Sequence, residues 1–549
     1  MRWFKRFRRN SQNQVDEERK SLTNEEHSEH VRPWREKLGM SEACQKPISC
    51  SEPKNSNTWI GVLQEFMQGS TQDSLSVAAL LTYYGRPCDS KFQEAWLHIV
   101  QTHITRHFPS FPPESAIKQH PEQLRNHLLQ VQEVVLRELG RLSPVLREVK
   151  LLDSLIDQYH RQIFNHLDLV LQTKRTHEQA YWTVDWVFRM YVRVGITGLR
   201  EVPEFYAAID PMQLTHYIQW AVEKLLSTVK DEIAALLSRI LENDAIEQAD
   251  YDNEEAFIQF HLDVIQCLDR FINRGKMLSH SVMLHIKRIC LCELHAIVQR
   301  YIYSEKKALK DLSKKAEMTE KYLRDWFKIF NSCYEIRLYV QQLCTDENEM
   351  PDSAGTVSML QTLEIQAKNL LLEKFDRLAE VNLKKYFHEE DRYMDTLKMS
   401  LKKYLAVFPE EIMSRGVILD EVYGCIISVY QKQLLKKSKY KKLSERWGDV
   451  GDRITRDAEE LHSFFCAKSC VKDRNKVLLQ ISMVLGWTDV SRRFCSNLDI
   501  NHDNSDKLLY EVLVWWGGRS AQEKAMIREY KFRAGSLPSC CLWWPLRCC

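Results

Sequence analysis

Cysteine and histidine, the residue types that bind zinc, stand close together in the segment from Met277 to Tyr303. Cys290, Cys292 and His295 form the pattern C-x-C-x-x-H. The segment has no Pro or Gly, and its apolar residues recur every three or four positions, which predicts a helix packed against several neighbours. Residues two apart on a helix point about 200° apart, so both thiols cannot bind one metal ion with regular geometry. We therefore expect core thiols here and no cofactor.

Two other clusters carry groups that could do chemistry. Cys466 and Cys470 can share a helix face, but no second thiol pair stands at zinc spacing, so we expect structural thiols. The run His-Glu-Glu-Asp at residues 388–391 is more typical of a solvated face than of an acid–base site. The sequence also lacks the nucleotide-binding, zinc-protease and serine-hydrolase motifs. The sequence therefore predicts a protein without enzymatic activity.

The first ten residues combine basic and aromatic side chains. The aromatic rings share one face of a helix, and the basic groups occupy the rest. The residues of this pattern are Arg2, Trp3, Phe4, Lys5, Arg6, Phe7, Arg8 and Arg9. Such a helix suits a membrane surface, with rings among the headgroups and basic groups against anionic lipid. A solvated basic tail or a nuclear-import-like patch is the alternative that these residues leave open.

A second basic stretch stands beside Tyr430 and Tyr440. Its lysines are Lys432, Lys436, Lys437, Lys439, Lys441 and Lys442. Lysines beside aromatic rings can contact the phosphates of nucleic acid or lipid. The net charge of +2 over 549 residues gives no global attraction to nucleic acid, so we expect no nucleic acid. A solvated helix surface is the favoured interpretation of these lysines, and a second contact with anionic lipid is the alternative.

The last dozen residues, PSCCLWWPLRCC, are rich in cysteine and tryptophan. The cysteines are Cys540, Cys541, Cys548 and Cys549. Cysteines clustered beside tryptophans suit S-acylation at a membrane surface, although the ending is not a C-a-a-X prenylation box. The alternative is a tail without function. In a reducing compartment, we expect the 16 cysteines to be mostly buried thiols.

Proline distribution predicts the elements that position these groups. Only Pro351 and Pro409 occur between Met212 and Leu537, and proline breaks helix interiors. No run with the alternation of β-strands stands out, so the fold class is all-α. Helices of about 30 residues are about 45 Å long, and several in up-down order predict an elongated rod of stacked helical bundles.

The chain divides into four predicted segments. Residues 1–56 are polar and form a disordered arm with a basic-aromatic start. Residues 57–345 form the N-terminal helical bundles, and residues 357–535 form the C-terminal ones, with Pro351 and Gly355 in the loop between. Residues 536–549 are the tail. We expect helices to stop near Gly140, to restart at Pro144, and to be separated at Gly275. No apolar run approaches the roughly 20 residues that span a bilayer, and the N-terminus does not resemble a secretory signal.

The helix first described resembles a known family. Its stretch ICLCELHAIVQRYIYSEKK (289–307) is similar to the Cys-Leu-x-Glu-Leu-x-x-Phe-Leu-x-x-Tyr pattern of the exocyst complex component 3 family, with Ile297 and Val298 in place of Phe-Leu. The segment YWTVDWVFRMYVRV (181–194) and the region 124–171 resemble that family's earlier helices. The basic N-terminus is closest to its tumour necrosis factor alpha-induced protein 2 branch, which includes exocyst component 3-like relatives.

This resemblance implies a rod of the tethering-complex type without catalysis. It also implies SNARE proteins, exocyst subunits or small-GTPase effectors as partners, and a role in exocytosis or plasma-membrane remodelling. In that branch the basic N-terminus contacts phosphoinositide, and Arg2, Lys5, Arg6, Arg8 and Arg9 are the matching positions. We thus expect a cytoplasmic protein peripheral to the plasma membrane. The alternative is a soluble helical scaffold without direct membrane binding.

Overall fold

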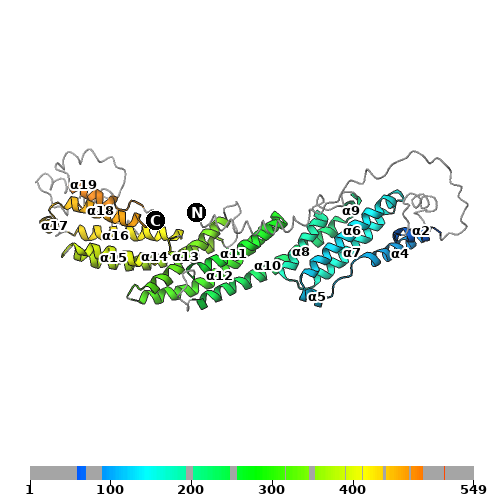
Figure 1. Ribbon diagram of the computed structural model, residues 1–549, viewed down its shortest axis with the longest axis horizontal. Helices are drawn as coiled ribbons and strands as arrows, with labels where there is room; N and C mark the ends of the chain where they lie inside the picture. Colours follow the sequence, from blue (N-terminus) through cyan, green and yellow to red (C-terminus); the bar gives the residue numbers. More distant parts are fainter. Residues whose placement is uncertain are drawn as a thin grey trace, which may run out of the picture. The chain divides into compact units, whose positions relative to one another are not determined.

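The computed structural model consists of helices and short connections in all the residues that it describes (Figure 1). These are residues 58–69, 90–192, 202–247, 256–344 except 316, 353–436 except 390 and 411, 440–468, 472–485 and 512. Within these ranges no residue belongs to a strand. The all-α fold class is therefore confirmed.

Contacts between residues divide the chain into two compact units. The first comprises the described residues up to Asp231 together with Lys276–Val282, and the second comprises Glu232–Gly275 and the described residues from Met283 onward. The division falls within helix α10, Pro211–Glu247. The boundary predicted around residues 346–356 lies mostly outside the described residues and stays a prediction. Gly355, expected in that loop, lies instead in the first turn of α14, Ser353–Tyr386.

The first unit is built around helix α6. Its helices are α2 Thr58–Met67, α4 Ser90–His107, α5 Glu114–Gln119, α6 Glu122–Glu148, α7 Leu152–Gln172, α8 His177–Val187, the π-helix η2 Phe188–Val192, α9 Glu204–Ala207 and the start of α10. Helix α6 packs against α5, α7 and α8, while α7 also contacts α4 and α9.

The bounds of helix α6 correct two predictions about where helices end and begin. It neither stops at Gly140 nor restarts at Pro144, because both residues lie inside it. The buried stripe continues across them through Leu139, Leu142 and Leu146, each fully buried. Burial of an apolar side chain stabilises the fold by about 1.5–3 kcal/mol, so several such residues outweigh the roughly 3 kcal/mol that an interior proline costs a helix.

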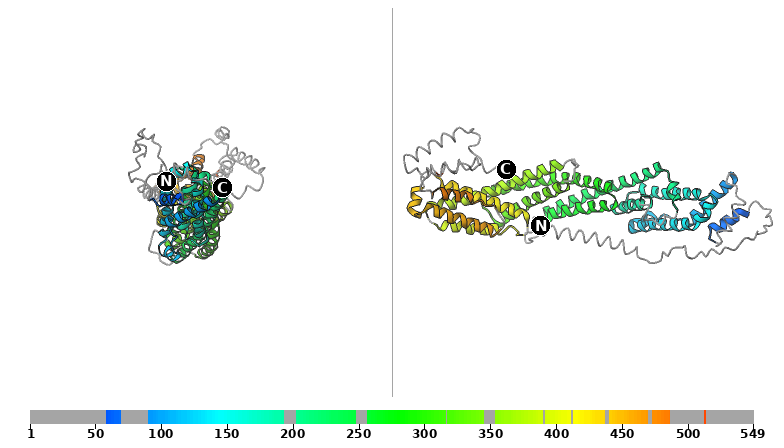
Figure 2. Two further views of the ribbon diagram at one scale, coloured as in Figure 1. Left: turned by 90° about the vertical axis from the view of Figure 1, so that its right-hand side faces the viewer. Right: turned by 90° about the horizontal axis from the view of Figure 1, so that it is seen from above.

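The second unit is a set of long helices packed side by side (Figures 1 and 2). After the end of α10 they are α11 Ala256–Leu278, α12 His280–Lys314, α13 Glu320–Leu343, α14 Ser353–Tyr386, α15 Arg392–Leu405, α16 Met413–Leu434, α17 Tyr440–Trp447, α18 Val450–Cys466 and α19 Lys476–Leu485. Helix α14 is central, because it packs against α13, α15 and α16. Helix α18 packs against α16, α17 and α19.

The segment from Met277 to Tyr303 is mostly helix α12, but the predicted break is displaced. Gly275 lies inside α11, and the chain turns at Ser279, whose hydroxyl accepts a hydrogen bond from the Val282 N–H at 3.1 Å. A Cβ on Gly275 would lie 3.2 Å from the backbone Cα of Met283 and 2.8 Å from Ile286 Cδ1. Glycine is therefore needed here for the close approach of α11 to α12, and not to end a helix.

Candidate functional site

The two predicted membrane contacts at the ends of the chain lie outside the described residues. They are the basic-aromatic residues 2–9 and the four cysteines from Cys540 to Cys549. Both remain predictions. The lysine stretch between α16 and α17 is the predicted site that the structure describes in part.

Four of its six lysines are described, and all four are exposed. Lys432 Nζ, in the last turn of α16, lies 2.9 Å from Glu380 Oε1, and Lys436 donates to Gln433 Oε1 at 2.7 Å. Lys441 and Lys442 stand in the first turn of α17 and pair with no carboxylate among the described residues. Lys437 and Lys439 lie outside the described residues.

Helix α14 brings further cations to this place. It runs parallel to α16, since Lys368 pairs with Glu421 at 3.0 Å and Lys432 with Glu380 further along both helices. The two helices therefore end together, and the last turn of α14 adds the exposed Lys384 and Lys385. We call these six described lysines the basic end of the second unit: Lys384, Lys385, Lys432, Lys436, Lys441 and Lys442.

A buried carboxylate holds the helices beneath the basic end. Asp457, on α18, is 3% exposed. Its Oδ2 accepts hydrogen bonds from the hydroxyls of Tyr386 at 2.5 Å and Tyr430 at 2.7 Å. Its Oδ1 lies 3.2 Å from Arg453 Nε. Tyr430, predicted as an aromatic neighbour of the lysines, is thus a buried anchor between α16 and α18 and not part of the surface.

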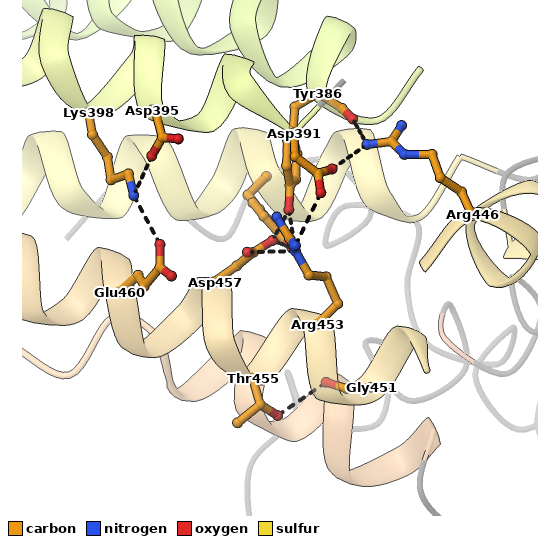
Figure 3. Close-up of polar contacts among 11 residues, drawn as sticks. Tyr386, Asp391, Asp395, Lys398, Arg446, Gly451, Arg453, Thr455, Asp457 and Glu460 are labelled. Carbon is orange, nitrogen blue, oxygen red and sulfur yellow. Dashed lines mark hydrogen bonds and ion pairs between the residues drawn. The ribbon is translucent and has the colours of Figure 1, made fainter. Parts of the chain in front are cut away.

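A second set of contacts fixes α17 to the same place (Figure 3). Arg446 donates to Asp391 Oδ1 at 2.7 Å and to the Tyr386 carbonyl at 2.8 Å, and Arg453 reaches the other oxygen of Asp391 at 3.3 Å. The Trp447 ring lies 5.5 Å from that of Tyr386. The acidic run at 388–391, expected on a solvated face, therefore contributes one carboxylate that positions α17.

Burial is the main cause of the shifted pKa of Asp457 in this cluster. It raises the pKa of Asp457, and hydrogen bonds from the two tyrosines and the charge of Arg453 partly offset that rise. Every oxygen of Asp457 has a donor, so the group serves as an anchor that ties α14, α16 and α18 together. The exposed lysines above it can bind phosphate groups through charge-assisted hydrogen bonds.

The cysteine clusters behave differently from one another. Cys290 is fully buried, and its thiol faces the Leu268 carbonyl at 4.0 Å, as expected of a core thiol. His295 instead bonds Thr356 Oγ1 at 2.8 Å. Cys466 is exposed, with its Sγ 3.4 Å from His462 Nε2. Cys470 lies outside the described residues, so the structural role predicted for this pair stays a prediction. Within the part of the chain that is described, no three His, Cys, Asp or Glu side chains are placed to hold a metal ion.

The comparisons with known proteins support the fold. No protein-family model matches the chain, and no curated protein matches it in sequence. The crystal structure of M-Sec matches with a TM-score of 0.63 at 14% identity, over 90% of this chain and 88% of that chain. At this identity the likeness shows the fold alone. The chain thus has an exocyst-like helical fold, which confirms the predicted resemblance at this coarser level without assigning a family.

Sequence reasoning missed the contribution of α14 to the basic end. Lys384 and Lys385 form a doublet directly before Tyr386, which could have marked a basic helix end. Their position beside Lys432 depends on the parallel course of α14 and α16, which no local pattern reveals. None of the described helices has the length and apolar character needed to span a bilayer.

Proposed function

We propose that the protein is a non-catalytic scaffold of exocyst-related type that tethers vesicles or remodels the plasma membrane. The observation that carries this proposal is the likeness of the helical fold to that of M-Sec, which covers 90% of the chain. The proposed partners are SNARE proteins, exocyst subunits or small-GTPase effectors. A soluble helical scaffold without membrane contact is the competing function that the experiments must separate.

We further propose that two basic surfaces recruit the protein to the cytoplasmic face of the plasma membrane. The first is the N-terminal arm with Arg2, Lys5, Arg6, Arg8 and Arg9. The second is the basic end of the second unit, where Lys384, Lys441 and Lys442 are exposed and pair with no carboxylate in the described ranges. Each basic residue near an anionic surface contributes on the order of 1 kcal/mol.

Co-sedimentation with vesicles tests this recruitment in the full-length protein. The vesicles are phosphatidylcholine with or without phosphatidylinositol bisphosphate. One variant replaces the five basic residues of the arm by Gln, a second carries Lys384→Gln, Lys441→Gln and Lys442→Gln, and a third combines both. A matched control carries Lys306→Gln, Lys307→Gln and Lys310→Gln, which neutralises three exposed lysines of α12.

Membrane recruitment predicts that the arm variant binds phosphoinositide vesicles more weakly than the basic-end variant and the control. The basic-end variant is expected to be intermediate, and the control is expected to bind like the wild type. If the wild type binds no better than the combined variant, the protein is a scaffold without direct membrane contact. Acyl-exchange labelling of Cys540, Cys541, Cys548 and Cys549 in cells tests the third contact, and absence of label excludes it.

Affinity purification from cell lysate tests the tethering role separately. The tagged full-length protein is expected to capture exocyst subunits or SNARE proteins, identified by antibodies against each. A protein carrying the arm replacements is expected to retain these partners, because the helical units and not the arm hold them. Failure to capture any protein of these classes contradicts the tethering proposal, whatever the vesicle result.

A further inference from the structure

The first unit contains a polar cavity outside all the sites described so far. It has a volume of about 240 Å³ and lies between the end of α7, the first turns of α8 and the middle of α10. A cavity needs only about 10–15 Å³ to hold one water molecule, so this one has room for a small polar group. Its lining includes the cationic side chains of Lys174, Arg175 and Lys224, against one carboxylate from Asp231.

Arg175 is the buried member of this set. Its side chain is only 6% exposed, and its Nη1 donates to Glu114 Oε2 at 3.0 Å. Its Nε donates to the Val170 carbonyl at 3.3 Å, at the end of α7. Its Nη2 is buried and has no hydrogen-bond partner in the described structure. A buried charged donor without an acceptor is costly, and because Nη2 has almost no accessible surface, Arg175 acts on the cavity as a fixed positive charge and not through this atom.

The other two cations are exposed and available. Lys174 and Lys224 come from different elements. Lys174 lies in the connection after α7, and Lys224 lies in the part of α10 that belongs to the first unit. Neither forms an ion pair with any described residue. Ser227 adds a hydroxyl to the lining, and its oxygen makes no hydrogen bond within the described ranges. Three cations and one hydroxyl, set against the carboxylates of Asp231 and of Glu114, match an anion with several acceptor oxygens.

We propose that this cavity binds a phosphate group, with Lys174, Arg175 and Lys224 as its cationic contacts. The phosphate belongs to a small phosphorylated ligand, which is either a soluble phosphoester or the headgroup of a phospholipid. Arg175 supplies a fixed positive charge beside the ligand, while the two lysines supply mobile N–H donors around it. The proposal does not rest on the tethering function, because it concerns only residues of the first unit.

Isothermal titration calorimetry of the full-length protein with inorganic phosphate and with inositol trisphosphate tests the site. The test variant carries Lys174→Gln and Lys224→Gln, which are exposed positions and leave the Arg175–Glu114 pair intact. The matched control carries Lys118→Gln and Lys230→Gln, which removes two exposed lysines outside the cavity. Thermal unfolding of both variants checks that the fold is kept.

Vesicle binding separates the two ligand sources. It is measured with phosphatidylcholine vesicles with and without phosphatidylinositol bisphosphate, in a protein whose arm and basic end are already neutralised. Binding of inositol trisphosphate without vesicle binding identifies a soluble phosphoester. Vesicle binding that depends on Lys174 and Lys224 identifies a lipid headgroup.

The proposal expects the test variant to bind at least about tenfold more weakly, since charge-assisted hydrogen bonds are among the strongest polar contacts. The control is expected to match the wild type. Absence of binding to every probe overturns the proposal. Binding that is unchanged in the test variant, or weakened equally in the control, overturns it as well.

Discussion

The two units of this protein bury different mixtures of titratable groups. Among the described residues, the first unit buries three histidines and one acid, and the second buries three acids, one histidine and three cationic side chains. The groups of the first unit are His103, His127, His160 and Glu138, and those of the second are Asp244, Glu305, Asp457, His261, Lys287, Lys374 and Arg415. Burial penalises whichever form is charged, so it lowers the pKa of a base and raises that of an acid. Acidification is therefore expected to destabilise the first unit through its histidines, whereas in the second unit the same loss at His261 is opposed by Glu305, whose pKa burial raises.

A histidine pair represents the first unit. His127 Nε2 lies 3.1 Å from His166 Nδ1, and the rings of Phe108 and Phe111 pack edge-on against the pair. Burial, aided by the charge of His166, lowers the pKa of His127 from 6.5 to about 4. The unfolded chain binds the proton more tightly. The pair therefore contributes full stability above pH 6.5 and loses it as the pH falls towards 4.

Glu305 represents the second unit. It is 4% exposed, and burial raises its pKa from 4.5 to about 7, with the negative charge of Asp244 adding to the rise. Lys328 offsets part of this effect, and it pairs with Asp244 at 2.7 Å. Here the folded chain binds the proton more tightly. The contribution of Glu305 to stability is therefore full below pH 4.5 and is lost as the pH rises through 7.

The largest expected effect comes from breaking the best-paired acid of the second unit. Asp457→Ala leaves Tyr386, Tyr430 and Arg453 without their shared acceptor, and we expect a loss of about 3–5 kcal/mol in the free energy of unfolding. Urea denaturation measures it. Asp395→Ala, whose side chain is 72% exposed beside Lys398, is the control and should change stability by less than about 1 kcal/mol. Equal losses in both variants contradict the anchoring role of Asp457.

Acidification should separate the two units. Between pH 6.5 and 5 the histidine pair is expected to cost the first unit about 2 kcal/mol, because one proton corresponds to about 1.4 kcal/mol per pH unit. Hydrogen exchange followed by mass spectrometry, corrected for the intrinsic effect of pH, reports each unit separately. Peptides of α6 and α7 should lose more protection than those of α12 and α13, because Glu305 opposes the loss at His261 in the second unit.

Replacing the histidine pair sharpens this test. A protein with His127→Phe and His166→Phe has no titrating group at this position, so its first unit should lose less protection on acidification than the wild type. A pH response that persists unchanged in this variant assigns the effect to other groups and contradicts the role of the histidine pair.

Glu305→Gln tests the opposite response of a buried acid in the second unit. The amide removes a buried charge, so at pH 8 the variant is expected to be more stable than the wild type by on the order of 1 kcal/mol. The advantage should shrink towards pH 5, where Glu305 is already protonated. Urea denaturation at both values measures it, with Glu317→Gln as an exposed control. A variant that is less stable at pH 8 than at pH 5, relative to the wild type, contradicts the raised pKa of Glu305.

The smallest effect on stability is expected at the surface above the Asp457 anchor. Lys441→Gln with Lys442→Gln should change the free energy of unfolding by less than about 0.5 kcal/mol, because exposed substitutions away from ion pairs are nearly neutral. Thermal unfolding measures this. A clearly destabilised variant shows that these lysines hold α17 in place, and the basic end is then part of the fold and not a free surface.

Much of the helical architecture could be predicted from local patterns. The apolar stripe of α12, from Val282 to Tyr301, is buried as its spacing indicates. Glycine and proline were less reliable signals of where a helix ends, because Gly140, Pro144 and Gly275 all lie inside helices. Glycine and proline disfavour a helix only locally, and the burial of the residues on both sides of them decides whether the helix continues. The two ends of the chain, where the sequence predicts membrane contacts, lie outside the described residues.

By itself, the sequence determined which segments are helical and which face of each is apolar, because that information repeats every three or four residues. Only the tertiary structure decided which polar groups meet. Tyr386 and Asp457 are separated by 71 residues and His127 and His166 by 39, yet each pair shares a hydrogen bond. The parallel course of α14 and α16 likewise assembles the basic end. Such contacts depend on which helices pack against each other, and the periodicity of one helix does not encode its packing partners.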